Sequence, residues 1–335
     1  MQLLYHTARQ VRFVTHLRYC VTVSYTKCTM QGKDFVSIAD LDSHDLSSIL
    51  DMAIERKKKG PDSPLAGQTL AMIFEKPSLR TRVSFDVAMY QLGGNSIYLA
   101  GDEVGLGKRE PIKDMAQVLS RYANIIMART FAHSTLVDLA KYATVPVING
   151  LSDLEHPCQA IADILTIREN KGQLEGLTVT YIGDGNNVAA SLLLVCALSG
   201  IQFKFAAPKG YEIPCEIQEK ASAISTASDY QVFTTQSPEE AVFGADVVYT
   251  DVWASMGQEA EAEQRRKDFA SYQITSDLLA MAKPDAILMH PMPVHHGDEF
   301  AEGLIDSPQS VLIDQAENRL HGQKAILVKL AENLA

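Results

Sequence analysis

The sequence lacks the features of a membrane protein, a nucleic-acid binder and a cysteine-rich metal protein. No apolar stretch reaches the roughly 18–20 residues that a membrane-spanning helix needs. Lysine and arginine number 30 against 41 acidic residues, a net charge of −11, whereas nucleic-acid binders usually present a basic face. The five cysteines have no metal-ligand spacing, and their odd number indicates reduced thiols. We therefore expect a cytoplasmic protein with no nucleic-acid or membrane partner.

Acidic residues are also absent from the first 29 residues, which contain four lysines or arginines. A transit peptide can have this composition, but the segment has no clean amphipathic repeat and no signal-type apolar core. The alternatives are a poorly ordered extension or a start that precedes the working Met30. We treat residues 1–32 as an extension and leave a targeting role for residues 1–29 open.

At 335 residues the chain is long for a single domain. Short apolar runs alternate with helical patterns, which is typical of parallel sheets covered by helices. We predict an α/β protein of two domains, each a mostly parallel sheet flanked by helices, with the active site in the interdomain cleft. The expected parts after the extension are a first domain 33–155, an interdomain helix 156–172, a second domain 173–314 and a C-terminal helix 315–335 that returns to the first domain.

Strands and helices are expected to alternate through most of each domain. The predicted strands are 69–74, 95–99, 124–128 and 145–148, followed by 177–182, 202–206, 231–234, 246–250, 286–289 and 311–313. The predicted helices are 41–59, 79–92, 111–122, 133–142 and 157–171, followed by 187–199, 214–225, 259–270, 275–281 and 315–333.

The stretch EKPSLRTR, residues 75–82, joins a predicted strand to a predicted helix. The free N–H groups and the dipole at a helix N-terminus favour an anion there. Ser78, Arg80, Thr81 and Arg82 could add charge-assisted hydrogen bonds to a phosphate. Alternatively, Ser78 is an N-cap and the arginines are solvated. The stretch alone leaves both interpretations open.

A second strand–turn–helix junction, TYIGDGNNVAA at residues 180–190, is similar in part to a dinucleotide-binding fingerprint. Val188 stands where the third glycine is required, and no acidic residue ends the next strand. NAD binding is therefore disfavoured. Asn186 and Asn187 instead offer amide groups to a polar ligand in the cleft.

The stretch HPCQ, residues 156–159, opens the long interdomain helix with Pro157 at its first position. His156 could donate a hydrogen bond to a carbonyl, although a lone histidine is more often structural. Cys158 has no general base that the sequence places beside it, which disfavours a nucleophilic role.

Two further polar stretches directly follow predicted strands. In DVWASMG, residues 251–257, Asp251 is placed to bind a cationic group and predicts an amine-bearing substrate. In HPMPVHHGD, residues 290–298, two prolines fix a loop whose backbone carbonyls can point inward. The three histidines of this loop lack the accompanying carboxylate or thiolate spacing of a metal site, so no metal is expected.

Taken together and in this order, the five stretches resemble the aspartate/ornithine carbamoyltransferase family over roughly nine-tenths of the chain. The family's Ser-x-Arg-Thr-Arg and His-Pro-x-Gln motifs match residues 78–82 and 156–159. The Asp-x-x-x-Ser-Met-Gly loop of its ornithine branch matches residues 251–257, whereas the aspartate branch has an arginine at the position of Asp251. The resemblance implies transfer of a carbamoyl group from carbamoyl phosphate to the δ-amine of L-ornithine, giving L-citrulline and phosphate.

The resemblance also implies roles for individual residues. Carbamoyl phosphate would be bound by Ser78, Leu79, Arg80, Thr81, Arg129, His156, Gln159, Pro291, Met292 and Arg319. Ornithine would be bound by Asn187, Asp251, Ser255 and Met256. Thr81, Arg129 and His156 would polarise the carbonyl group, and no cofactor, metal or covalent enzyme intermediate would be required. The first domain would therefore hold carbamoyl phosphate and the second ornithine.

The resemblance also implies a subunit assembly, and the sequence departs from the family's pattern at two positions. Members form homotrimers or multiples of trimers, and the loop around residues 105–113 would complete the site of the next subunit. Leu79 replaces a small residue or threonine but keeps the backbone N–H that a phosphate needs. Pro291 replaces the cysteine of the ornithine branch, while carbonyls 291 and 292 can still accept from a carbamoyl NH2. The alternatives are a carbamoyltransferase for putrescine, lysine or N-acylornithine, or a non-catalytic paralogue, against which the intact arginine set argues.

Overall fold

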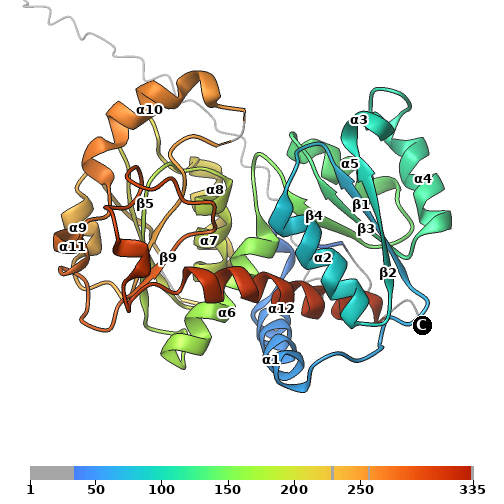
Figure 1. Ribbon diagram of the computed structural model, residues 1–335, viewed down its shortest axis with the longest axis horizontal. Coiled ribbons are helices and arrows are strands. Elements are labelled where there is room, and N and C mark those ends of the chain that lie inside the picture. Colours follow the sequence, from blue (N-terminus) through green and yellow to red (C-terminus); the bar gives the residue numbers. More distant parts are fainter. Residues whose placement is uncertain (1–33, 228–229, 256, 333–335) are drawn as a thin grey trace, which may run out of the picture.

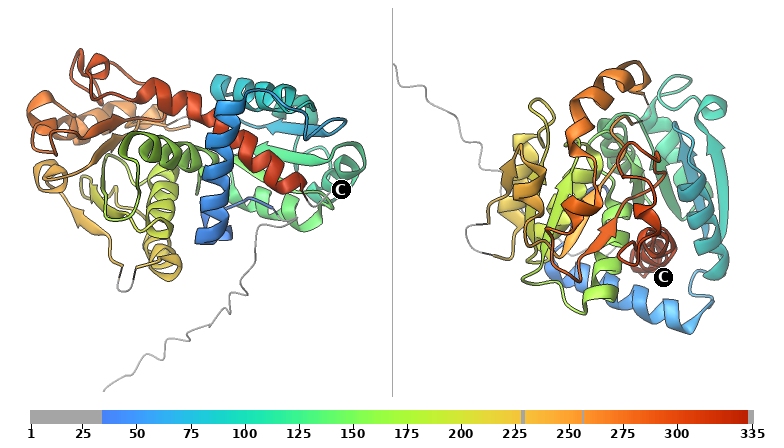
Figure 2. Two further views of the ribbon diagram at one scale, coloured as in Figure 1. Left: turned by 90° about the horizontal axis from the view of Figure 1, so that it is seen from below. Right: turned by 60° about the vertical axis from the view of Figure 1, so that its left-hand side comes forward.

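The computed structural model describes residues 34–332 except 228, 229 and 256. The chain forms two α/β domains that lie side by side, each with helices packed on a parallel sheet (Figures 1 and 2). The predicted fold class is thereby confirmed. The expected extension 1–32 lies outside the described residues. No helix in the part of the chain that the structure describes is long and apolar enough to cross a membrane.

The first domain contains a four-stranded sheet of order β2-β1-β3-β4, in which all pairs are parallel. Its strands are β1 (Thr69–Phe74), β2 (Asn95–Ala100), β3 (Ile125–Arg129) and β4 (Val147–Leu151). Its helices are α1 (Ser43–Lys59), α2 (Leu79–Gln91), α3 (Gly101–Val104), α4 (Ile112–Tyr122) and α5 (His133–Tyr142), preceded by the 3-10 turn η1 (Ile38–Asp40). The sequences of β1 and β3 are almost wholly apolar because both faces of a central parallel strand are covered.

The second domain contains a five-stranded parallel sheet of order β7-β6-β5-β8-β9. Its strands are β5 (Thr178–Ile182), β6 (Gln202–Ala206), β7 (Phe233–Thr235), β8 (Val247–Thr250) and β9 (Ile287–Met289). Its helices are α7 (Asn187–Leu198), α8 (Cys215–Ile224), α9 (Pro238–Val242), α10 (Ala262–Phe269) and α11 (Ser276–Leu279), with 3-10 turns η2 (Glu259–Glu261), η3 (Ala270–Tyr272) and η4 (Leu304–Asp306). Helix α7 is apolar on all sides because it is buried along its whole length after the first residue.

Two helices connect the domains. Helix α6 (Pro157–Lys171) leads from the first domain to the second, and α12 (Leu312–Ala331) crosses back to pack against α1, α2 and α6 (Figures 1 and 2). One apolar cluster runs without a break from the first sheet through α6 and α12 to α7 and the second sheet. The two domains therefore share part of their hydrophobic core, which holds the loops of one sheet opposite those of the other.

The predicted strand 311–313 is wrong, because α12 already begins at Leu312. The sheet-like contact with β9 falls one residue earlier, where Ser310 forms a bridge with Leu288 and the Val311 N–H donates to the Leu288 carbonyl at 3.1 Å. A run of three apolar residues fits a strand and a helix start equally well by sequence. The strands β1 and β6 have their predicted bounds, whereas β4 and β7 start two residues later than predicted.

Candidate active site

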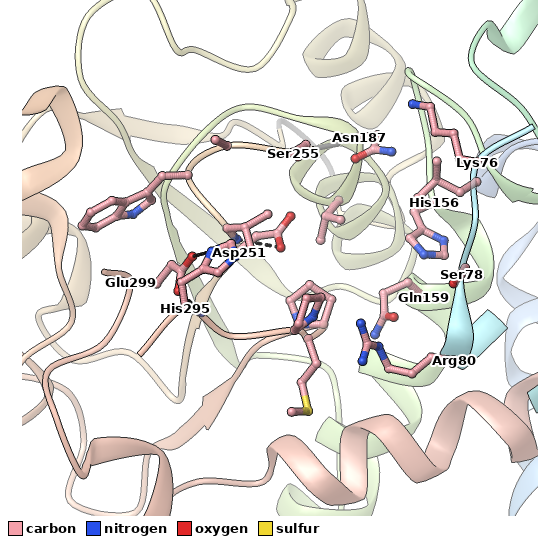
Figure 3. Close-up of a pocket in the computed structure, with 18 of the residues that line it drawn as sticks. Lys76, Ser78, Arg80, His156, Gln159, Asn187, Asp251, Ser255, His295 and Glu299 are labelled. Carbon is pink, nitrogen blue, oxygen red and sulfur yellow. Dashed lines mark hydrogen bonds and ion pairs between the residues drawn. The ribbon is translucent and has the colours of Figure 1, made fainter. Parts of the chain in front are cut away.

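A cavity of about 580 Å³ lies where the carboxyl ends of both sheets meet (Figure 3). Ligands of open parallel sheets bind at this end because the loops that follow the strands converge there. Of the fourteen residues predicted for the site, twelve line the cavity. They are Ser78, Leu79, Arg80, Arg129, His156, Gln159, Asn187, Asp251, Ser255, Pro291, Met292 and Arg319. Thr81 is buried just behind the wall, and Met256 lies outside the described residues.

The junction after β1 is both an N-cap and a candidate anion site. The Ser78 hydroxyl accepts from the Thr81 N–H at 3.3 Å and caps α2, while Arg80 extends into the cavity (Figure 3). The N-cap of the one interpretation is therefore present, and Arg80 lies where the other interpretation places it. Arg82 does not contribute, because its guanidinium lies over the ring of Tyr98 at 3.8 Å and it is not among the cavity-lining residues.

Arg129 and Arg319 meet Arg80 at this end of the cavity without a carboxylate partner in the described residues. The Thr81 hydroxyl accepts from Arg319 Nη2 at 2.6 Å and from Arg129 Nη1 at 3.5 Å. Burial, together with repulsion among the arginines, lowers the pKa of Arg129 and of Arg319 to about 10. Buried cations without counter-charges are costly, so this cluster is built for an anion that can accept several hydrogen bonds.

His156 precedes α6 and is buried beside the same arginines. Burial, and then the charges of Arg319 and Arg129, lower the pKa of His156 well below its usual value. The ring is therefore neutral at physiological pH and can donate from one nitrogen. Its backbone N–H donates to the Ser191 hydroxyl at 2.8 Å, which fixes the start of the helix.

Cys158 follows in the same helix and is fully buried. Its thiol donates to the Asn149 carbonyl at 3.3 Å, and burial raises the pKa of Cys158 to about 12. A protonated, buried thiol is a poor nucleophile. This agrees with the sequence analysis, which disfavours a nucleophilic role for Cys158.

At the opposite wall Asp251 follows β8 and faces the cavity (Figure 3). Its carboxylate accepts from Asn186 Nδ2 and from the Val252 N–H, both at 2.8 Å. Burial, with smaller contributions from Glu299 and Asp184, raises the pKa of Asp251 to about 7. A cationic ligand would favour the ionised form of this carboxyl group.

Asn187 and Ser255, the other predicted residues of this wall, are held by hydrogen bonds to neighbouring loops. Asn187 donates from Nδ2 to the Ser152 carbonyl at 2.5 Å, which ties α7 to the loop after β4. The Ser255 N–H donates to Gln258 Oε1 at 2.9 Å. Both residues line the same cavity as Asp251.

The loop after β9 supplies the floor between the two walls. His290 accepts at Nδ1 from the Met292 N–H at 2.9 Å, and burial lowers the pKa of His290 to about 3. Met292 adopts a φ of 58°, a left-handed conformation that is uncommon outside glycine. Pro291 and Met292 line the cavity beside Gln159 and Arg319.

Several cavity-lining residues were not predicted from the sequence. They are Lys76, Pro77, Leu151, Val188, Val252, Trp253, Ala254, Glu259, Ala262, Arg266, Pro293, His295, Asp298 and Glu299. His295 is held by Glu299, whose Oε1 lies 3.0 Å from His295 Nδ1. Most of these residues flank the predicted ones in the sequence, so only their position in the same loops indicates that they line the cavity.

The two parallel sheets and the cavity between them define a two-domain α/β protein, and the chain belongs to the aspartate/ornithine carbamoyltransferase family. Residues 33–169 match the family's carbamoyl-P binding domain, and residues 175–330 match its Asp/Orn binding domain. The chain is 50% identical to the ornithine carbamoyltransferase of Anoxybacillus flavithermus over 305 residues, which cover 90% of this chain and 97% of that protein. It is also 50% identical to the anabolic ornithine carbamoyltransferase of Pyrococcus furiosus over 303 residues, covering 89% and 96%.

The solved structures are similar to the same extent. The structure of ornithine carbamoyltransferase from Pyrococcus furiosus matches with a TM-score of 0.86 and covers 90% of this chain and 97% of its own. The similarity therefore extends over both domains and the cavity between them.

Proposed function

We propose that the protein is an ornithine carbamoyltransferase, which transfers the carbamoyl group of carbamoyl phosphate to the δ-amine of L-ornithine. One observation carries this proposal: the same cavity has a cluster of three unpaired arginines on one wall and the buried carboxyl group of Asp251 on the other. The first fits a phosphate and the second an ammonium group. The relatives at 50% identity that carry this name support the assignment.

Carbamoyl phosphate is placed with its phosphate at the N-terminus of α2. Ser78, the Leu79 N–H and Arg80 bind phosphate oxygens there, since Leu79 is 74% exposed and lines the cavity at the start of α2. Arg129 and His156 polarise the carbamoyl carbonyl, and Thr81 acts by holding Arg129 and Arg319. Hydrogen bonds that strengthen as charge develops on the oxygens lower the barrier.

Ornithine is placed with its α-ammonium group at Asp251, and its neutral δ-amine attacks the carbamoyl carbon. A C–N bond forms, the tetrahedral intermediate collapses, and the C–O bond to phosphate breaks, while the departing phosphate takes up the proton that the amine loses. No covalent enzyme intermediate is needed. Holding both reactants in contact is worth roughly 7–11 kcal/mol, which is the main task of a cavity shared by two domains.

Assembly, location and metabolic role are further parts of the proposal. We infer a homotrimer or a multiple of trimers in which the segment 105–113 completes the site of a neighbouring subunit. We place the enzyme in the cytoplasm. A role in arginine biosynthesis is supported by the Pyrococcus furiosus relative, whose name describes it as anabolic.

A citrulline assay with carbamoyl phosphate and a panel of amines tests the proposal. Ornithine should give a kcat/KM at least about 100-fold above those of putrescine, lysine and N-acetylornithine, because only free ornithine offers both an α-ammonium group and a δ-amine. Arg80→Ala should abolish turnover while the circular dichroism spectrum stays unchanged. Preference for another amine would replace ornithine as the substrate, and near-normal activity of Arg80→Ala would refute the assignment of the phosphate site.

A further inference from the structure

We propose that Asp163 is a positioning residue that holds the Gln159 side-chain amide with its carbonyl oxygen free for the ligand, so that the site selects a carbamoyl NH2 over a methyl group. The proposal rests on the proposed function and extends it to a residue that does not line the cavity. Asp163 is fully buried in α6, one turn after Gln159, the spacing at which side chains of a helix meet.

The direction of the hydrogen bonds around Asp163 is set by a backbone group. The N–H of His290, which can only donate, is bound by Gln315 Oε1 at 2.8 Å. The amide of Gln315 is thereby oriented, and its Nε2 must point the other way, where it donates to Asp163 Oδ1 at 2.7 Å. The ionised carboxylate has no proton to donate, so Asp163 Oδ1 presents an acceptor to its other neighbours as well.

Gln159 is the second side chain bound to the same oxygen. Its Nε2 donates to Asp163 Oδ1 at 2.8 Å. A flipped amide would place two acceptor oxygens against each other, which is unfavourable in a buried position. Gln159 is therefore held in one orientation, and its Oε1 is buried with no partner among the described residues.

The free Oε1 belongs to a residue of the cavity wall. Gln159 lies there between His156 and Arg80 (Figure 3). A buried acceptor without a partner is costly, so a ligand group that donates a hydrogen bond is favoured over one that cannot. The carbamoyl NH2 donates, whereas the methyl group of acetyl phosphate, otherwise the same molecule, does not.

Asp163 also connects this oxygen to the loop after β9. Through Gln315 it holds the backbone of His290, which directly precedes the Pro291 and Met292 carbonyls. Its second oxygen accepts from the Tyr249 hydroxyl at 3.0 Å. One buried carboxyl group thus orients both sets of acceptors that we assign to the carbamoyl NH2.

The test compares the affinities of the protein for carbamoyl phosphate, acetyl phosphate and inorganic phosphate. Binding is measured by the change in fluorescence of Trp253, which is the single tryptophan of the chain and lines the cavity. In the wild type carbamoyl phosphate should bind on the order of tenfold or more tighter than acetyl phosphate. Asp163→Ala should lower the ratio of the affinity for carbamoyl phosphate to the affinity for acetyl phosphate about tenfold, while the affinity for inorganic phosphate stays the same. A ratio that Asp163→Ala leaves unchanged would overturn the proposal.

Two conservative variants separate orientation from general damage. Asp163→Asn can still accept both glutamine amides at Oδ1 and donate to the Tyr249 hydroxyl, so it should keep the wild-type ratio. Tyr249→Phe removes the bond to Oδ2 and the bond that Gln315 Nε2 donates to the Tyr249 hydroxyl at 3.1 Å. It leaves both bonds to Oδ1 in place, so it should keep the wild-type ratio too. If Asp163→Ala does not fold, loss of the ratio in Asp163→Asn with normal phosphate binding still refutes the proposal. Absence of turnover with every amine would instead refute the proposed function and would leave the ratio measurable.

Discussion

Replacement of Asp251 by asparagine should stabilise the ligand-free protein at alkaline pH while it damages ornithine binding. The Asp251 side chain is buried, and the pKa of Asp251 is raised from 3.8 to about 7, chiefly by burial. Between these two values the native state holds a proton that the unfolded chain has released. Because the native state binds more protons, stability falls as the pH rises through this window.

The size of the effect follows from the two pKa values. Each pH unit within the window costs about 1.4 kcal/mol. From pH 5 to pH 7 the wild type should therefore lose about 2.3 kcal/mol of unfolding free energy through Asp251, because half of the native carboxyl groups are still protonated at pH 7, and about 0.3 kcal/mol more by pH 8. Asparagine does not titrate, so Asp251→Asn should avoid this loss.

Comparing the unfolding free energies at two pH values cancels those effects of the substitution that do not depend on pH. Asn186 Nδ2 cannot turn away from position 251, since Asn186 Oδ1 already caps α7 by accepting from the N–H groups of Val188 and Ala189. One hydrogen bond is therefore lost in Asp251→Asn, at a cost of about 1 kcal/mol. That cost does not depend on pH and cancels in the difference.

Urea unfolding of the ligand-free wild type and of Asp251→Asn at pH 5 and pH 8 measures this difference. The stability of the variant relative to the wild type should rise by about 2.5 kcal/mol between the two conditions. Asp277→Asn, at an exposed position on α11, is the matched control for the replacement of an aspartate by an asparagine. Equal pH dependence of the wild type and Asp251→Asn would show that Asp251 is not a carboxyl group with a raised pKa.

The same variant has a kinetic consequence that separates the two walls of the cavity. Loss of a buried carboxylate partner costs about 2–5 kcal/mol of binding, so the KM for ornithine should rise at least about 30-fold. The dissociation constant of carbamoyl phosphate should change little. Equal losses for both substrates would contradict the placement of ornithine at Asp251.

Two further substitutions test other parts of the structure. Arg319→Met should weaken carbamoyl phosphate binding by at least about 100-fold. Calorimetry should show no loss of stability of the ligand-free protein, because the buried arginines repel one another. A large loss of stability would contradict a cluster of arginines without carboxylate partners. Gly185→Ala should destabilise the protein by about 2–4 kcal/mol in urea unfolding, because a Cβ there would lie 2.5 Å from the backbone of Glu212 and of Ile213; unchanged stability would contradict this close approach.

The arrangement of the cavity was largely predictable because it depends on strand ends. Each predicted polar stretch follows an apolar strand, and parallel strands place their carboxyl ends at one edge. Ser78, Asp251 and Pro291 could therefore be assigned to one cleft before any contact was known. The start of α12 was not predictable, because Val311 and the two residues after it fit both a strand and a helix.

The residues that support the site could not be found in the same way. Asp163 is a single carboxyl group in an otherwise apolar segment, but its bond to Gln315 joins positions 152 residues apart. Glu155 likewise accepts from the hydroxyl of Ser37 and the N–H of Ile38, and so connects the loop before His156 to the start of the first domain. Such contacts depend on how distant parts of the chain pack against one another, and no local pattern encodes them.

The path of α12 has a consequence for how the protein is made. The helix carries both Gln315, which orients the loop after β9, and Arg319, which meets Arg80 and Arg129. These residues leave the ribosome after all strands of both sheets. A nascent chain can thus form both sheets and still lack a competent phosphate site, so a chain released early would not trap carbamoyl phosphate. Two domains expressed as separate fragments would combine into an active enzyme only if α12 is recovered with them.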